Sequence, residues 1–197
     1  MKLFGSTRSP FVRKAAIVAH EADVWGDIDF VEIEIPAPAP NEAHRAANPL
    51  MKLPTLVLAD GAAIYDSPVI CAYLDGGLFP DAGPARWRAL TRAGLADGLL
   101  DMMLLWRAEL RRPEVHRQTS LFATWEKRRE AALDRMAEEI GEGFDIGDVA
   151  TGVALDYLDY RFEGLDWRAA RPALAAWHRT FVERPSVKAT KFGESWA

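Results

Sequence analysis

The N-terminus of the chain reads KLFGSTRSPFVRK over residues 2–14. Its apolar residues 2–5 predict a short β-strand, and Ser9 followed by Pro10 predicts the start of a helix over residues 10–21. A hydroxyl at the N-cap accepts a backbone N–H, and a proline at the first helical position gives up no hydrogen bond. Such a junction turns free N–H donors and the positive helix end outward, which suits an anion. Taken alone, this segment favours Ser9 as a simple helix cap.

The residues that follow alternate strand-like and helix-like patterns as far as residue 76. An Asp60-Gly61 pair predicts a tight hairpin turn, and the alternating prolines of residues 36–40 predict a stiff extended segment. The order β-α-β-α-β-β-α predicts a mixed four-stranded sheet with helices on its faces, which is a thioredoxin-like order. The further predicted strands span residues 28–35, 55–58 and 62–65, and the further predicted helices span residues 42–47 and 67–74.

The pattern of predicted secondary structure changes after this segment. Residues 76–84 read GGLFPDAGP, with three glycines and two prolines, and therefore predict a linker. Beyond it only helical periodicity remains, which predicts an all-α bundle. The expected domains are residues 1–77, with the α/β sheet, and residues 84–197, with the helices.

Composition excludes several classes of protein. The chain has 197 residues, a net charge of -5, 49% hydrophobic residues and 27% charged residues, which is typical of a soluble globular protein. Without a basic run it is not expected to bind nucleic acid. It has neither an apolar stretch long enough to span a bilayer nor a signal-peptide pattern, so the cytoplasm is the expected location.

Cysteine and histidine usage argue against disulfide and metal chemistry. Cys71 is the single cysteine, which excludes an internal disulfide, and its apolar neighbours predict a small buried hydrophobe. The four histidines lack metal-ligand spacing, so no metal is predicted.

Two further local signals lie in the first half of the chain. Pro54 directly precedes a predicted strand, a position that suits a cis bond, although a trans proline is the commoner case. A cis bond there turns the backbone N–H and C=O of Leu53 outward. In the third signal, Asp66-Ser67-Pro68, Ser67 is predicted to cap a second outward-facing helix start, with the Asp66 carboxylate beside it.

Together, in this order and spacing, these signals resemble the cytosolic glutathione transferase family. The resemblance covers the whole chain and lies in SPFVRK (residues 9–14), NPLMKLP (48–54), DSPVI (66–70) and a helix start at residues 145–148. There the family has Ser or Thr, two residues and Asp, whereas this chain has Asp145 as the capping residue. Aspartate caps about as well as serine, so this helix start is expected to persist with a role in folding. The opening Ser-Pro-Phe-x-Arg-Lys is similar to that of a bacterial subgroup.

The resemblance implies a mode of glutathione binding. The γ-glutamyl carboxylate would meet Ser67, and the amino group would meet Asp66, which is shorter than the family's usual Glu. The cysteinyl backbone would pair with Leu53 beside Pro54. The remaining residues implied by the resemblance, at the glycyl carboxylate, are Lys52 and Arg13.

The thiol would point at Ser9, which would act as a hydrogen-bond donor to the thiolate. A free thiol has a pKa of about 8.5. A hydrogen bond to the charged sulfur contributes ~1.5–3 kcal/mol and the helix end ~0.3–1 kcal/mol, which together lower the pKa by about one to three units. Ser6 and then Thr7 are the alternative donors.

A small hydrophobic electrophile is expected to bind between the domains. Met and Trp side chains suit an adaptable apolar pocket, although Met102 and Met103 are explained equally well as helix core. The expected lining residues are Met102, Met103, Trp106 and Arg107.

The leading functional hypothesis is a transferase that conjugates the glutathione thiolate to this electrophile in detoxification. The alternatives are a glutathione-dependent peroxidase, dehalogenase or isomerase, because a fold does not fix a reaction, or a non-catalytic interaction protein. The resemblance also implies a homodimer, although the sequence reveals no self-complementary patch.

Overall fold

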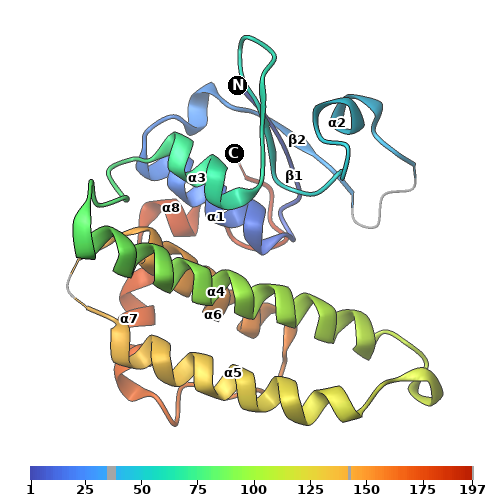
Figure 1. Ribbon diagram of the computed structural model, residues 1–197, viewed down its shortest axis with the longest axis vertical. Helices are drawn as coiled ribbons and strands as arrows, with labels where there is room; N and C mark the ends of the chain where they lie inside the picture. Colours follow the sequence, from blue (N-terminus) through green and yellow to red (C-terminus); the bar gives the residue numbers. More distant parts are fainter. Residues whose placement is uncertain (35–38, 142, 197) are drawn as a thin grey trace. The chain divides into compact units, whose positions relative to one another are not determined.

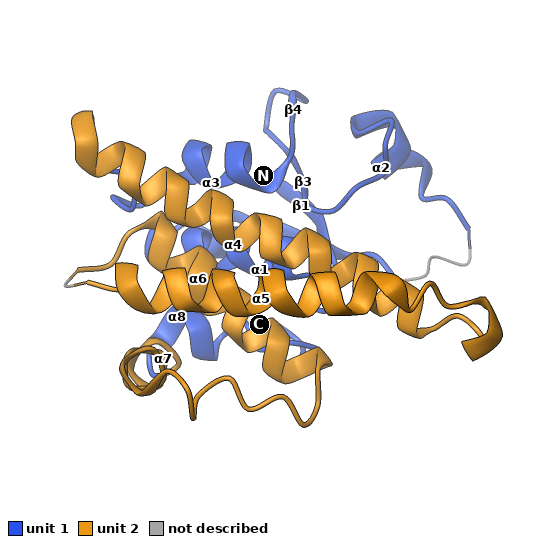
Figure 2. Ribbon diagram, turned by 60° about the horizontal axis from the view of Figure 1, so that its bottom comes forward, with its two compact units in different colours: residues 1–80, 183–197 blue, residues 81–182 orange. Residues whose placement is uncertain are grey.

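The computed structural model describes residues 1–34, 39–141 and 143–196 (Figure 1). The chain folds into two compact units, which are coloured separately in Figure 2. Unit 1 comprises residues 1–80 and 183–197, and unit 2 comprises residues 81–182. The division after Pro80 falls inside the predicted linker. The return of the C-terminal segment to unit 1 differs from the prediction, which assigned it to the helical domain. Its aromatic side chains find their partners in unit 1.

The sheet of unit 1 has the predicted mixed four-stranded topology, in the order β2-β1-β3-β4. The central strand β1 (Lys2–Gly5) pairs in parallel with β2 (Asp29–Glu32) and antiparallel with β3 (Thr55–Val57), which pairs antiparallel with β4 (Ala63–Ile64). Three strands are shorter than predicted. Leu58 N–H donates to the carbonyl of Ala62 at 2.8 Å and so closes the predicted hairpin turn.

The helices of unit 1 begin where polar caps stand before them. Ser9 caps α1 (Pro10–Glu21) by accepting the N–H of Val12 at 3.4 Å, and Asn41 caps α2 (Glu42–Ala47). The third helix, α3 (Ser67–Leu74), spans the predicted residues, but its N-cap is Asp66 rather than the predicted Ser67, which lies in its first turn. The short α8 (Pro185–Lys188) packs on α1, and η1 (Trp25–Asp27) is a 3-10 turn.

Aromatic side chains of the C-terminal segment pack into the core of unit 1. Trp196 is buried with Val12 of α1, and Trp25, Phe30 and Leu53 pack against this cluster. The ring centroids of Phe30 and Trp196 lie 5.4 Å apart in a stacked arrangement. The C-terminal segment thus forms part of the hydrophobic core of the sheet domain.

Only glycine fits at position 5, because side chains of this core lie close to its backbone. A Cβ atom at Gly5 would lie 2.6 Å from both the Phe30 ring and a methyl group of Val12. Any larger residue would therefore have to displace the Phe30 ring and the Val12 side chain, at the point where the chain leaves β1 for the turn that carries Ser9.

Unit 2 consists of helices, as predicted. The long, mostly buried α6 (Ile146–Arg161) packs along α4 (Gly83–Leu110), behind which it lies in Figure 1. The remaining elements are α5 (Ser120–Glu139), α7 (Pro172–Phe181) and the 3-10 turn η2 (Glu114–His116).

The predicted helix start at residues 145–148 is confirmed. Asp145 Oδ1 accepts the N–H groups of Gly147 at 2.7 Å and Asp148 at 3.2 Å, while Asp148 Oδ2 accepts the N–H of Asp145 at 3.0 Å. This reciprocal arrangement is a capping box. Arg92 of α4 forms ion pairs with both carboxylates and so ties α6 to α4.

Over the described residues, no helix combines the length and the apolar character needed to cross a membrane.

Candidate functional site

In the turn between β1 and α1, the Ser9 hydroxyl still has a proton to donate, whereas the Ser6 hydroxyl already donates its proton to a side chain of the protein. The half-buried Ser9 hydroxyl accepts one bond, from the N–H of Val12, and its own proton remains available for a ligand. The buried Ser6 hydroxyl instead donates to Glu32 Oε1 at 3.0 Å. The N–H of Thr7 also donates to Glu32, at 3.2 Å, and its carbonyl accepts the N–H of Gly193 at 3.1 Å. These bonds favour Ser9 as the donor in this turn.

The turn before β3 is held by three buried polar side chains. The carbonyl of Lys52 accepts bonds from Thr55 Oγ1 at 2.9 Å, His44 Nε2 at 3.2 Å and Asn48 Nδ2 at 3.3 Å. The following Leu53–Pro54 bond is cis. In the described part of the chain, the backbone N–H and C=O of Leu53 take part in no hydrogen bond.

The surroundings of His44 in this network favour its neutral form. Burial lowers the pKa of its side chain below the ordinary value, although the bond to the Lys52 carbonyl acts in the opposite direction. Its Nδ1 is buried and has no hydrogen-bond partner among the described residues. A proton on Nδ1 would therefore have no acceptor. Sequence reasoning missed His44, Asn48 and Thr55, because only the fold brings their side chains to one carbonyl.

The start of α3 presents two polar groups with spare hydrogen-bonding capacity. The Ser67 side chain is buried, and within residues 1–34, 39–141 and 143–196 its hydroxyl makes no hydrogen bond. Asp66 is exposed, and its carboxylate makes no capping bond. The Tyr65–Asp66 peptide bond is also cis.

The sheet register brings these three segments to one end of unit 1. Phe4 pairs with Thr55, so the Leu53–Pro54 turn lies beside the turn that follows β1. Strand β4 runs antiparallel to β3 and leads into α3, so the helix start falls at the same end. The arrangement offers a hydroxyl donor, an open backbone pair and a helix N-terminus with a nearby carboxylate, and could hold an extended anionic peptide.

Two predicted glycyl-carboxylate residues differ in their surroundings. The Lys52 side chain is exposed beside the turn. Arg13 is buried, its guanidinium packs 4.5 Å from the Phe192 ring centroid, and its Nη2 donates to the Val187 carbonyl at 3.5 Å. Arg13 therefore faces the C-terminal segment and is left out of the site. No local pattern of residues indicates that this segment folds onto α1.

The predicted electrophile residues on α4 divide into core and half-buried positions. Met103 is fully buried in the core of unit 2, as its alternative interpretation allows. Trp106 is also buried and stacks with other aromatic rings of unit 2. Met102 and Arg107 stay half-buried, and Arg107 Nη1 donates to Tyr157 Oη at 3.4 Å.

Among the described residues, one group of possible metal ligands exists that residue spacing did not predict. Ligand atoms of Asp156, Asp159 and His178 lie within 4.8 Å of one another. Their oxygens are already engaged: Arg168 and Trp167 Nε1 pair with Asp159, and His178 Nε2 lies 2.6 Å from Asp156 Oδ1. The guanidinium supplies the positive charge that a cation would bring, so the cluster is explained as a salt-bridged contact. Cys71 is buried, as predicted, and forms no disulfide.

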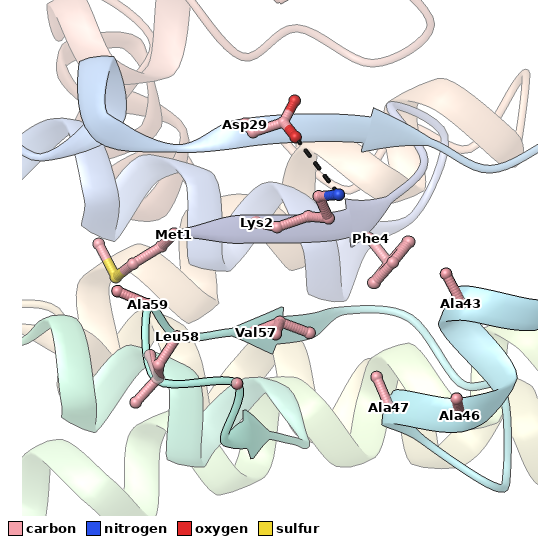
Figure 3. Close-up of a pocket in the computed structure, with 11 residues that line it drawn as sticks. Met1, Lys2, Phe4, Asp29, Ala43, Ala46, Ala47, Val57, Leu58 and Ala59 are labelled. Carbon is pink, nitrogen blue, oxygen red and sulfur yellow. Dashed lines mark ion pairs between the residues drawn. The ribbon is translucent and has the colours of Figure 1, made fainter.

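A cavity of about 570 Å³ lies between the sheet and α2, and its lining does not include Ser9, Leu53, Asp66 or Ser67 (Figure 3). Alanines 43, 46 and 47 of α2 line it, together with side chains of β1 and β3. At its edge Lys2 Nζ lies 3.7 Å from Asp29 Oδ2. The lining offers no group suited to thiol chemistry.

Comparison with known proteins decides the family. The glutathione S-transferase N-terminal domain model matches residues 8–76, and the C-terminal domain model matches residues 106–180. A glutathione S-transferase from Methylobacillus flagellatus, solved with glutathione bound, is 33% identical over 96% of this chain and 98% of its own, with a TM-score of 0.89. The chain belongs to the glutathione S-transferase family.

Other relatives match this chain over nearly its whole length. A glutathione transferase family member from Pseudomonas fluorescens Pf-5, solved with glutathione, is 36% identical over 96% of this chain and 98% of its own, with a TM-score of 0.88. The same protein was also solved with S-(propanoic acid)-glutathione. The uncharacterized GST-like protein YibF of Escherichia coli K12 is 28% identical over 97% of this chain and 98% of its own.

Proposed function

We propose that this glutathione S-transferase binds reduced glutathione on unit 1 and conjugates its thiolate to a small hydrophobic electrophile. The observation that carries the proposal is the gathering of Ser9, Leu53 and Ser67 at one end of the sheet, each with spare hydrogen-bonding capacity. Relatives of similar length that were solved with bound glutathione support the choice of ligand.

In the proposed pose, glutathione lies extended across the three segments. The Ser67 hydroxyl and the N-terminus of α3 take the γ-glutamyl carboxylate, and Asp66 takes the amino group. The backbone of Leu53 pairs with the cysteinyl residue, and the exposed Lys52 takes the glycyl carboxylate. These assignments use groups that no other hydrogen bond in the described residues occupies.

Ser9 then stabilises the sulfur as a thiolate. Its hydroxyl donates to the sulfur while it continues to accept the N–H of Val12. A hydrogen bond to a charged atom contributes about 1.5–3 kcal/mol, which lowers the thiol pKa by about one to two units. The thiolate attacks the electrophilic carbon, a carbon–sulfur bond forms, and the leaving group departs with its electron pair.

Three finer assignments accompany this proposal. The Ser-Pro-Phe-x-Arg-Lys start supports membership of a bacterial subgroup of the family, and the proposed need for reduced glutathione supports a cytoplasmic location. A homodimer is supported by an exposed apolar stripe in unit 1, with Tyr65 at 42%, Val69 at 52% and Tyr73 at 52% exposure. Val69 and Tyr73 lie four residues apart and share one face of α3.

Calorimetry with reduced glutathione tests the ligand assignment. The protein should bind glutathione, and Ser67→Ala should weaken binding by about 1–2 kcal/mol, or roughly tenfold, through loss of a charge-assisted hydrogen bond. Ser120→Ala, which changes an exposed serine of unit 2, is the matched control and should bind like the unchanged protein. Absence of binding at millimolar glutathione, or equal affinity in the Ser67 variant, would contradict the pose.

A further inference from the structure

Two arginines of unit 2 meet at one buried tyrosine. Arg107, on α4, donates from Nη1 to Tyr157 Oη at 3.4 Å. Arg161, the last residue of α6, also hydrogen bonds Tyr157, and its guanidinium carbon lies 3.7 Å from the Tyr160 ring centroid. Because Tyr157 is buried, the phenol holds both guanidinium groups close to each other at the α4–α6 contact.

Neither arginine has a carboxylate partner in the described part of the chain. This differs from Arg92, which pairs with Asp148, and from Arg171, which pairs with Glu130. Two half-buried positive charges side by side repel each other unless an anion lies between them.

The state of Arg161 agrees with an unbalanced positive charge. Burial lowers the pKa of its guanidinium, and the neighbouring Arg107 lowers it further. Its Nε atom is buried and has no hydrogen-bond partner among the described residues. A guanidinium usually directs such an N–H at a carboxylate or a phosphate.

The surroundings of the pair are aromatic. Trp106 and Phe162, which adjoin the two arginines in sequence, have ring centroids 5.4 Å apart in an edge-to-face arrangement. Phe122 continues this cluster at 6.1 Å from Trp106. A ligand held here by an anionic group would therefore have an apolar neighbour for its body.

We propose that Arg107 and Arg161 together bind the carboxylate of a small organic acid, and that this acid is the second substrate, a step that rests on the proposed function. A planar carboxylate accepts two parallel N–H bonds from one guanidinium fork, and a second guanidinium neutralises the remaining charge. Tyr157 positions the two forks. The proposal narrows the substrate class from hydrophobic electrophiles in general to electrophiles that carry a carboxylate beside an apolar body.

Binding of an unreactive acid tests the site without glutathione. Calorimetry should show benzoate binding at least about tenfold tighter than benzamide, which has the same shape and no charge. The double variant Arg107→Gln/Arg161→Gln should lose this preference, and Arg107→Lys, which keeps the charge but not the fork, should retain part of it. Arg128→Gln, which removes an exposed arginine of unit 2, is the control and should keep the preference. Equal affinity for the two probes, or an unchanged preference in the double variant, would overturn the proposal.

Turnover of a matched pair of electrophiles tests the assignment as second substrate. The thiolate attacks the benzylic carbon of para-(chloromethyl)benzoate or para-(chloromethyl)benzamide, the carbon–chlorine bond breaks, and chloride leaves with the electron pair. The benzoate should have at least about tenfold higher kcat/KM, and the double variant should raise its KM with little change in kcat. Circular dichroism checks that each variant is folded.

The two proposals fail in different ways. Benzoate binding without turnover of either electrophile would contradict the proposed transferase and the role of the acid as substrate, while the anion site would stand. Turnover of both electrophiles at equal kcat/KM, in the original protein and in the double variant, would overturn the anion site and leave the transferase.

Discussion

The hydroxyl of Ser6 donates to Glu32 Oε1 at 3.0 Å, across the parallel pair of strands β1 and β2. The same carboxylate accepts the N–H of Thr7. Glu32, at the end of β2, therefore fixes the first half of the turn and uses the Ser6 proton. The Ser9 hydroxyl, three residues later, has a proton to donate.

Replacement of Ser9 and of Ser6 should have different consequences. Ser9→Ala should raise the pKa of bound glutathione by about one to two units and lower kcat, because the thiolate loses its donor. Ser6→Ala should leave that pKa unchanged and lower the free energy of unfolding by about 1 kcal/mol. The thiolate absorbance of the binary complex, titrated against pH, gives the pKa. An equal pKa in the Ser9 variant and the original protein would remove Ser9 from the mechanism.

Trp196 should stabilise unit 1, including the Leu53 turn that is proposed to bind glutathione. Trp196→Ala should lower the free energy of unfolding by about 3 kcal/mol, because its ring stacks on Phe30 and packs against Val12 and Leu53. Trp196→Phe should retain most of the stability. Urea unfolding measures both, with Trp87→Ala as control, because Trp87 is 66% exposed. A similar loss in the Trp87 and Trp196 variants would contradict this role of the C-terminal segment.

His44 should make the protein sensitive to mild acid. Its pKa is lowered by burial, so the folded state favours the neutral ring more than the unfolded state does. Its contribution to stability is therefore complete above the unfolded pKa of about 6.5 and is lost as the pH falls from there toward the folded pKa.

Unfolding by urea between pH 7.5 and 5, values chosen to bracket the ordinary histidine pKa of about 6.5, measures this effect. His44→Gln should be less stable at neutral pH and should show a smaller fall in stability on acidification. The pKa of His20 is also lowered by burial, so His20 contributes equally to the pH dependence of stability in the His44→Gln variant and in the original protein. Parallel curves for the variant and the original protein would exclude His44 as the sensitive group.

The exposed stripe on α3 should mediate dimerisation. Val69→Glu places a charge in the centre of the stripe and should produce a monomer near 21.9 kDa, whereas the original protein should sediment at about twice that mass. Val115→Glu is the matched control, because Val115 is 84% exposed outside the stripe. Monomeric behaviour of the original protein, or a dimer that survives Val69→Glu, would contradict the proposed interface.

Local sequence patterns determined most of the elements. Proline and the capping side chains set the start of α1, and the capping box set the start of α6, because each acts within four residues of the helix end. The alternation of strand and helix patterns likewise predicted the order of the elements along the chain and a mixed four-stranded sheet. The cap of α3 was misplaced by one residue, since serine and aspartate are both good caps and stand side by side there.

Tertiary structure alone decided which side chains meet. The sequence by itself established a strand–turn–helix with Ser9, the Pro54 turn and the helix start at Asp66 and Ser67, because short-range conformational preferences encode them. Three relationships joined residues far apart in the chain: Ser6 with Glu32, Arg13 with the C-terminal segment, and Arg107 with Tyr157. No local preference encodes such pairs. They follow from the packing of whole elements, which places one hydrogen-bonding group within reach of another only after the chain has folded.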